Sequence, residues 1–251
     1  MNKNLSVFND YSRYYDLLYQ DKDYVGEVDY IARIMARHGI TQGNLLEFGS
    51  GTGKHGRLLG GRGFQVHGIE RSAEMVAQVA LDSNFTCQSG DICTIKMDRS
   101  FDAVLSFFHV ISYQTSNSSV QAVFERAAEH LQSDGLFIFD FWYSPAVYTQ
   151  RPVVRVKHMT DATTDITRLA EPISYPNENR VDVNYTIYAR DLATGVTQTL
   201  SETHSMRHFS LPEIDFLAKL NGFTRIGVEE FLTGGPVSED TWGVCVILRK
   251  V

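Results

Sequence analysis

The glycine-rich stretch at residues 45–53, Leu-Leu-Glu-Phe-Gly-Ser-Gly-Thr-Gly, has the composition of a turn that holds a nucleoside cofactor. An apolar run predicted to be a buried strand leads into alternating glycines, and a helical pattern follows. Glycine tolerates positive φ and lets a ligand approach the backbone, while the first N–H groups of a helix supply donors and partial positive charge. Gly49, Gly51 and Gly53 are therefore expected to cradle the polar part of such a cofactor.

Acidic side chains stand at the ends of the strands predicted next to this turn. Glu47 precedes the first glycine, Glu70 ends the next strand, and Asp91 with Ile92 follows the strand after that. The carboxyl ends of parallel strands meet at one edge of a sheet, where ligands bind in open α/β folds. Glu70 is expected to accept hydrogen bonds from ribose hydroxyls. Asp91 is expected to bind an adenine amino group, with Ile92 against the ring.

The same turn also matches the dinucleotide fingerprint G-x-G-x-x-G over residues 51–56, so a nicotinamide-dependent (NAD) oxidoreductase is one alternative. Glu47 argues against it, because a carboxylate just before the first glycine repels a pyrophosphate but suits a cofactor with an ammonium group. The chain also shows no second mononucleotide-binding half. A non-catalytic binding protein that keeps the fold is another alternative, which the intact acidic and glycine positions disfavour.

Strand and helix patterns alternate strictly through residues 40–140, which predicts a doubly wound α/β sheet with helices on both faces. Helical patterns precede this region at residues 7–19 and 24–38, and shorter ones follow within it, one of them at residues 73–81. From about Pro145 to His208 no helix is expected, and alternating apolar residues predict antiparallel strands. A helix at residues 211–221 and two strands then return to the α/β pattern.

The predicted organisation is a core formed by residues 1–144 and 209–251, in which residues 1–39 are an N-terminal helical cap. Residues 145–208 form an antiparallel β insertion, expected either to cover the acceptor or to join two copies in a homodimer. Its alternating apolar face must be buried against something.

Composition limits the classes of partner. With 251 residues, 43% apolar and 21% charged, the chain has ordinary globular usage. The net charge of −7 disfavours a broad nucleic-acid-binding surface. No run is long enough for a membrane helix and no signal peptide is recognised. Three scattered cysteines lack zinc-ligand spacing, so no metal is expected, and they suit a reducing cytoplasm.

The segments Glu-Phe-Gly-Ser-Gly-Thr-Gly, Ile-Glu-Arg-Ser and Gly-Asp-Ile together resemble the motif series of class I S-adenosylmethionine-dependent methyltransferases over about residues 40–140. The resemblance implies a Rossmann-like seven-stranded sheet whose last strand is antiparallel and lies between the fifth and sixth strands. It implies S-adenosylmethionine as the cofactor. The core residues expected to bind it are Glu47, Gly49, Gly51, Gly53, Glu70, Arg71, Met75, Asp91, Ile92 and Ser106.

A narrower resemblance covers most of the chain. Residues 15–24, the Gly51-Thr-Gly-Lys-His turn and Leu-Thr-Gly-Gly-Pro at 232–236 resemble bacterial methyltransferases that N-methylate nucleotide-linked amino sugars, as in desosamine and mycaminose pathways. The resemblance implies a nucleotide-linked sugar as the favoured small-molecule acceptor. It also implies a β-rich insertion after the fifth strand, and that Tyr15, Tyr19 and Tyr24 help to enclose the cofactor. The chain departs from the family at residues 107–113, which are bulkier and include His109. O-methylation of another small molecule therefore stays open.

His109 is the candidate catalytic residue, because it follows the fourth strand near the expected position of the methyl group. Methyl transfer is an in-line displacement, and positioning alone can contribute about 7–11 kcal/mol. A hydroxyl acceptor needs a general base, whose help is typically about 10²–10⁴-fold, whereas an amine must only lose its proton. A histidine that only packs or faces solvent is the alternative interpretation.

Overall fold

The computed structural model describes residues 12–80 and 82–251. By the density of their contacts, the described residues form two units. The core unit comprises residues 23–150 and 208–251, and the β unit comprises residues 12–22 and 151–207. The α/β sheet lies in the core unit.

The core unit contains a seven-stranded sheet with the order β10-β11-β5-β4-β1-β2-β3. Strands β1 to β5 pair in parallel, and β11 is antiparallel to both of its neighbours, β5 and β10. This confirms the predicted class I arrangement, with the final strand inserted beside the fifth. The bounds are β1 Gly43–Phe48, β2 Phe64–Glu70, β3 Phe85–Ser89, β4 Phe101–Ser106, β5 Leu131–Trp142, β10 Phe223–Glu230 and β11 Gly243–Lys250.

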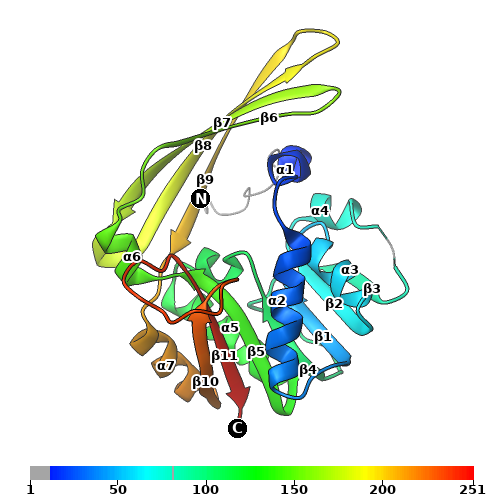
Figure 1. Cartoon of the computed structure of the whole chain (residues 1–251), viewed down its shortest axis with the longest axis vertical. Coiled ribbons are helices and arrows are strands. Elements are labelled where there is room, and N and C mark those ends of the chain that lie inside the picture. Colours follow the sequence, from blue (N-terminus) through cyan, green and yellow to red (C-terminus); the bar gives the residue numbers. More distant parts are fainter. Residues whose placement is uncertain (1–11, 81) are drawn as a thin grey trace. The chain divides into compact units, whose positions relative to one another are not determined.

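Helices cover both faces of this sheet (Figure 1), as the alternation of patterns predicts. Their bounds are α2 Tyr24–Arg37, α3 Lys54–Gly60, α4 Ala73–Ala77, η2 Val110–Tyr113, α5 Asn117–His130, α6 Ser144–Thr149 and α7 Leu211–Leu220. Successive strand residues point to opposite faces. Leu46 and Phe48 therefore pack in one apolar cluster with α5 and α7, while Leu45 packs in the other with α2 and α3.

Two helices differ from the sequence expectation. The helix predicted at residues 73–81 ends at Ala77 in α4, and Leu81 lies outside the described residues. The stretch expected to lack helices opens with α6, a single short helix that has a proline in its first turn. Proline fits there because its missing N–H would have no intrahelical partner. A helix of this length carries too few residues for its periodicity to be recognised.

The β unit consists of a four-stranded antiparallel sheet and α1 Ser12–Leu18. The strands follow the order β6-β7-β8-β9 (Figure 1), which confirms the predicted antiparallel insertion after the fifth core strand. Leu18 packs with Ile166, Ile187 and Ala189 in the apolar cluster of this unit. The bounds are β6 Arg155–Thr160, β7 Thr164–Tyr175, η3 Pro176–Glu178, β8 Arg180–Asp191 and β9 Thr197–Arg207.

The first predicted helix, at residues 7–19, is described only from Ser12, so its beginning falls outside the described residues. Residues 12–22 group with the β unit, and the role of residues 1–39 as an N-terminal cap of the core stays a prediction. None of the described helices combines the length and apolar composition needed to cross a bilayer.

Candidate functional site

The glycine turn joins β1 to α3, and its three alternating glycines all have positive φ: +72° at Gly49, +55° at Gly51 and +78° at Gly53. A Cβ atom on Gly49 would lie 2.6 Å from the side chain of Val110, and one on Gly53 would lie 2.4 Å from the ring of Phe85. A Cβ atom on Gly51 would meet only the Met75 sulfur, at 3.9 Å. Gly51 is thus the glycine with an open side, where a ligand can approach the backbone.

Glu70, at the end of β2, is tied to this turn. Its Oε2 accepts a hydrogen bond from the Gly51 N–H (2.9 Å), and its Oε1 accepts one from the Ser72 N–H (2.8 Å). Burial raises the pKa of the Glu70 carboxyl, and these two N–H donors oppose that shift. Each carboxylate oxygen can accept a second hydrogen bond. Glu70 therefore orders the turn and still has capacity for hydroxyl donors.

Replacing Glu70 by alanine is expected to weaken S-adenosylmethionine binding by about 1.5–3 kcal/mol, the range for hydrogen bonds that involve a charged group. The change removes the acceptor for the Gly51 N–H as well as the acceptor expected for the ribose. Isothermal titration measures the effect. Glu129→Ala, which removes an exposed carboxylate from α5, is the matched control. Equal affinities in the two variants would contradict the assignment.

Three buried side chains form a row beside the turn. His55, the second residue of α3, has its Nε2 2.6 Å from Glu27 Oε2 on α2 and its Nδ1 3.9 Å from Glu47 Oε1 on β1. Glu47 is 2% exposed, and its Oε2 has no hydrogen-bond partner among the described residues. Burial, with a contribution from the charge of Glu70, raises the pKa of Glu47 to about 8. An acid in this position favours a positively charged ligand group.

The raised pKa of Glu47 predicts a pH-dependent stability of the protein without cofactor. The folded-state pKa of about 8 exceeds the ordinary value of 4.5. The stabilising contribution is therefore complete below pH 4.5 and is lost as the pH rises towards 8. Glu47→Gln cannot ionise, so the variant is expected to unfold at a higher temperature than the parent at pH 8 and at a similar temperature at pH 5. The same difference in unfolding temperature between the two proteins at pH 5 and at pH 8 would contradict this.

Residues that directly follow β2 and β3 also border the glycine turn. Ser72 caps α4, because its Oγ accepts from the Met75 N–H (3.2 Å), and this places Met75 in the buried position opposite Gly51. Arg71 is exposed. The Gly90 N–H donates to the Glu70 carbonyl (2.9 Å), which joins the end of β3 to the end of β2.

Asp91 and Ile92 follow directly at this edge. Asp91 is exposed, and its Oδ1 accepts from the Cys93 N–H (2.8 Å) in a local turn. Ile92 is buried in the apolar cluster shared with α5. Both residues therefore stand beside Glu70 as the sequence analysis expects, although their contacts with a base remain a prediction.

The end of β4 holds His109 against a buried aspartate of β5. The His109 N–H donates to Asp140 Oδ1 (3.0 Å), and the ring Nδ1 lies 2.7 Å from Asp140 Oδ2. Asp140 is fully buried, whereas the His109 side chain is 24% exposed. Phe108 and His109 both have positive φ, 65° and 60°. Such backbone is costly for these residue types and is concentrated at functional sites.

The surroundings of His109 are aromatic. The ring of Trp142, near the end of β5, meets the imidazole edge-on with centroids 6.0 Å apart. Ser106, the last residue of β4, is fully buried, and its Oγ has no hydrogen-bond partner among the described residues. The imidazole Nδ1 thus lies within ion-pair distance of a buried acid, although neither Nδ1 nor Asp140 Oδ2 makes a hydrogen bond among the described residues.

Two polar residues of this site were not predicted. Asp140 interrupts the apolar strand Leu-Phe-Ile-Phe-Asp-Phe-Trp in the sequence, and a lone acid in a buried strand is itself a signal, since buried charges must be paired. Glu27 lies on an amphipathic helix whose polar positions look solvent-facing in the sequence. Its partner His55 stands on another helix, so their contact cannot be read from spacing.

The three tyrosines expected to enclose the cofactor fall in different places. Tyr24 opens α2, and its ring meets His55 edge-on with centroids 5.0 Å apart, which brings it to the glycine turn. Tyr15 and Tyr19 lie on and just after α1 in the β unit, with centroids 4.8 Å apart. Arg168 Nη1 donates to the Tyr19 hydroxyl (3.2 Å). The enclosing role of Tyr15 and Tyr19 remains a prediction.

A family model described as a methyltransferase domain matches residues 45–135, from β1 through the glycine turn to the start of β5. The chain is 30% identical over 227 residues to a dTDP-3-amino-3,6-dideoxy-alpha-D-glucopyranose N,N-dimethyltransferase of Streptomyces fradiae, covering 88% of this chain and 85% of that protein. The chain belongs to the S-adenosylmethionine-dependent methyltransferases.

Other similarities agree with this assignment. A dTDP-3-amino-3,4,6-trideoxy-alpha-D-glucopyranose N,N-dimethyltransferase of Streptomyces venezuelae is 27% identical to this chain. The alignment spans 90% of this chain and 94% of that protein. The structure of the sugar N-methyltransferase KedS8 from Streptoalloteichus superimposes with a TM-score of 0.80 at 21% identity, covering 98% and 97% of the two chains. The fold is shared over its full extent, and the methyltransferase uses S-adenosylmethionine as its cofactor.

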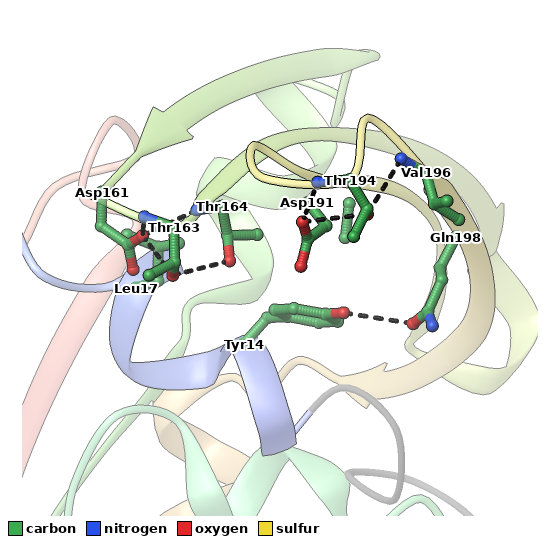
Figure 2. Close-up of a pocket in the computed structure, with 10 residues that line it drawn as sticks. Tyr14, Leu17, Asp161, Thr163, Thr164, Asp191, Thr194, Val196 and Gln198 are labelled. Carbon is green, nitrogen blue, oxygen red and sulfur yellow. Dashed lines mark hydrogen bonds between the residues drawn. The ribbon is translucent and has the colours of Figure 1, made fainter.

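A separate pocket of about 470 Å³ lies within the β unit (Figure 2). Its walls come from α1 and from the two hairpin turns at Asp161 and Asp191. Each aspartate accepts backbone N–H groups of its own turn, and these hydrogen bonds lower the pKa of both carboxyls. The Tyr14 hydroxyl donates to the Gln198 amide oxygen across the opening (3.4 Å). The two aspartates thus hold their hairpin turns.

Proposed function

We propose that this methyltransferase transfers methyl groups from S-adenosylmethionine to the amine nitrogen of a nucleotide-linked amino sugar. The observation that carries the proposal is the likeness to two relatives whose names specify dTDP-linked amino sugars as acceptors, because it extends over 88% and 90% of this chain. The charge and burial of the core residues support the assignment, as follows.

On the cofactor side, the side chains fit the chemistry of S-adenosylmethionine. The buried Glu47 Oε2, which lacks a donor among the described residues, suits the ammonium group of the methionine part. The open side of Gly51 leaves room for the cofactor along the turn, and Glu70 has remaining acceptor capacity for the ribose. Bound there, S-adenosylmethionine supplies a methyl group activated by its sulfonium. The chain's part is to hold this group in line with the acceptor.

On the acceptor side, His109 is proposed as the general base. An alkylamine is largely protonated near neutral pH and has no lone pair in that form, so it must lose a proton before it can be methylated. The imidazole of His109 is proposed to take this proton, and Asp140 holds the ring and stabilises the imidazolium that forms.

The proposal is tested with paired acceptors. Purified protein is incubated with S-adenosylmethionine and either a dTDP-3-amino-dideoxy sugar or its analogue with a hydroxyl at the same carbon, and the products are identified by mass spectrometry. One or two methyl groups on the amino sugar, and none on the analogue, are expected. Methylation of the hydroxyl analogue alone would instead favour an O-methyltransferase, the second candidate, which the His109–Asp140 pair also suits because hydroxyls require a base.

The role of residues 145–208 remains a separate proposal, either as acceptor cover or as a contact between two copies. Sedimentation and limited proteolysis of the whole protein, with and without acceptor, distinguish the two roles. A stable dimer at low concentration supports the contact role, whereas a monomer whose proteolysis within the insertion is slowed by acceptor supports the cover.

A further inference from the structure

His55 occupies an unusual position for a structural histidine, because its Nε2 makes a short contact with one buried carboxyl group and its Nδ1 lies within ion-pair distance of a second. Glu27 and Glu47 are 6% and 2% exposed, and His55 itself is 7% exposed. Holding α2 against α3 requires only the short contact from Nε2 to Glu27, at 2.6 Å. The second nitrogen, Nδ1, faces Glu47 at 3.9 Å across a longer gap. That second contact joins the imidazole to the proposed ammonium site.

Two arrangements of protons are compatible with this row. In one, neutral His55 donates its Nε2–H to Glu27, and Glu47 is a protonated acid directed towards Nδ1. In the other, the proton has passed from Glu47 to Nδ1, which leaves an imidazolium between two carboxylates. The total charge of the three groups is the same in both. The first arrangement avoids a buried charge on Glu47, and the second places a negative charge where a ligand cation would need it.

We propose that His55 is a proton-holding residue for the cofactor site, which accepts the proton of Glu47 when the cofactor's ammonium group binds. The 3.9 Å between Glu47 Oε1 and Nδ1 exceeds a hydrogen-bond distance, so the carboxyl group must first approach the ring. The O–H bond of Glu47 then breaks, a new N–H bond forms at Nδ1, and Glu27 stabilises the imidazolium through Nε2. No proton enters or leaves the solvent. The inference rests on the proposed placement of the ammonium group beside Glu47.

The neighbouring charged and titratable groups support this assignment. From β2, Glu70 disfavours a second negative charge on Glu47, and from β3 the Cys87 thiol has a pKa raised by burial and is neutral. From α2, Tyr24 packs edge-on against His55, and the Lys54 ammonium of α3 lies 5.0 Å from the centre of the Tyr24 ring. Glu47 is thus an acid that needs both a proton acceptor and an incoming cation in order to ionise, and His55 supplies the acceptor.

The test is calorimetric titration of S-adenosylmethionine into the protein, in buffers of different ionisation enthalpy, between about pH 6 and 8. The parent protein is expected to exchange few protons with the buffer, and its affinity is expected to vary little with pH. His55→Gln keeps a donor for Glu27 but cannot accept a proton. This variant is expected to release about one proton per cofactor bound, with affinity rising up to about tenfold per pH unit below the pKa of Glu47.

Two further measurements separate the possible failures. If Glu47→Gln binds S-adenosylmethionine as tightly as the parent protein, Glu47 does not meet the ammonium group. The proposed proton transfer to His55 is then overturned together with that placement. If Glu47→Gln binds S-adenosylmethionine weakly, but His55→Gln releases no proton and its affinity does not depend on pH, only the proposed proton transfer is overturned. Nitrogen NMR of the His55 ring in the parent protein gives a readout that needs no variant: the ring should change from the neutral to the cationic form on cofactor binding, and an unchanged ring contradicts the proposal.

Discussion

Replacing His109 by asparagine is expected to lower kcat by about 10²-fold or more, while the affinity for S-adenosylmethionine changes little. Asparagine keeps the polarity and approximate size of the side chain and its backbone N–H can still donate to Asp140, but the titrating group is gone. Because a base must be neutral to accept a proton, activity falls in acid when His109 carries this function. The acid limb of the pH–rate profile should therefore disappear in the variant.

Asp140→Asn is the companion variant. An amide oxygen can still accept the His109 N–H, whereas the negative charge 2.7 Å from Nδ1 is lost. We expect a reduced kcat with the acid limb shifted, since the imidazolium would lose its stabilising partner. If His109→Asn instead raises KM and keeps both kcat and the acid limb, the residue only shapes the pocket. Catalysis would then depend on positioning alone, which suffices for an amine that reaches the site unprotonated.

Replacing Gly53 by alanine is expected to lower the free energy of unfolding more than replacing Gly51 by alanine. The residue has φ of +78°, and leaving glycine in left-handed backbone costs about 1–2 kcal/mol. The new Cβ atom would also lie 2.4 Å from the Phe85 ring, and such overpacking typically adds about 1–3 kcal/mol. Phe85 cannot yield easily, because its ring also fills the space in front of two other glycines: a Cβ atom would lie 2.2 Å from the ring if added to Gly56 and 3.2 Å from it if added to Gly68.

Gly51→Ala is the matched comparison, since it has the same backbone requirement without the clash. We expect it to lower stability only by the backbone term, about 1–2 kcal/mol, but to weaken cofactor binding by roughly tenfold or more because its methyl group enters the open side of the turn. Denaturant midpoints and cofactor titrations on both variants measure the two effects separately. Equal losses of stability would mean that Phe85 does not constrain Gly53.

The sequence predicts the parts of this site that depend on neighbouring residues. The glycine turn is recognisable because three alternating glycines stand between a strand pattern and a helical pattern. Glu70 is recognisable because a strand end in a parallel sheet has a fixed location. The antiparallel insertion is equally local, since alternating residues such as Val181 and Val183 indicate a sheet with one buried face.

The contacts that bring remote residues together could not be predicted in the same way. His109 meets Asp140 because β4 and β5 are neighbours in register, with Ser106 opposite Phe139, and this register is not encoded in the spacing of the two residues. His55 meets Glu27 through the packing of α3 on α2. For the first pair the sequence supplies His109 as a candidate, and the arrangement of the sheet selects its partner. For the second pair the sequence marks neither residue, and only the packing of the two helices brings them together.

The antiparallel strand β11 has a consequence for how the enzyme assembles during synthesis. Gly243 pairs with Trp142, and Cys245 pairs with Asp140, so the whole β unit and β10 are translated before β5 acquires this neighbour. Until then β5 is an edge strand with unpaired backbone N–H and C=O groups, and Asp140 lacks the neighbouring strand beside which it lies in the folded protein. Such a distant pairing slows folding, because a long loop must close before the contact forms. We infer that the emerging chain passes through an aggregation-prone stage in which the base is not yet assembled.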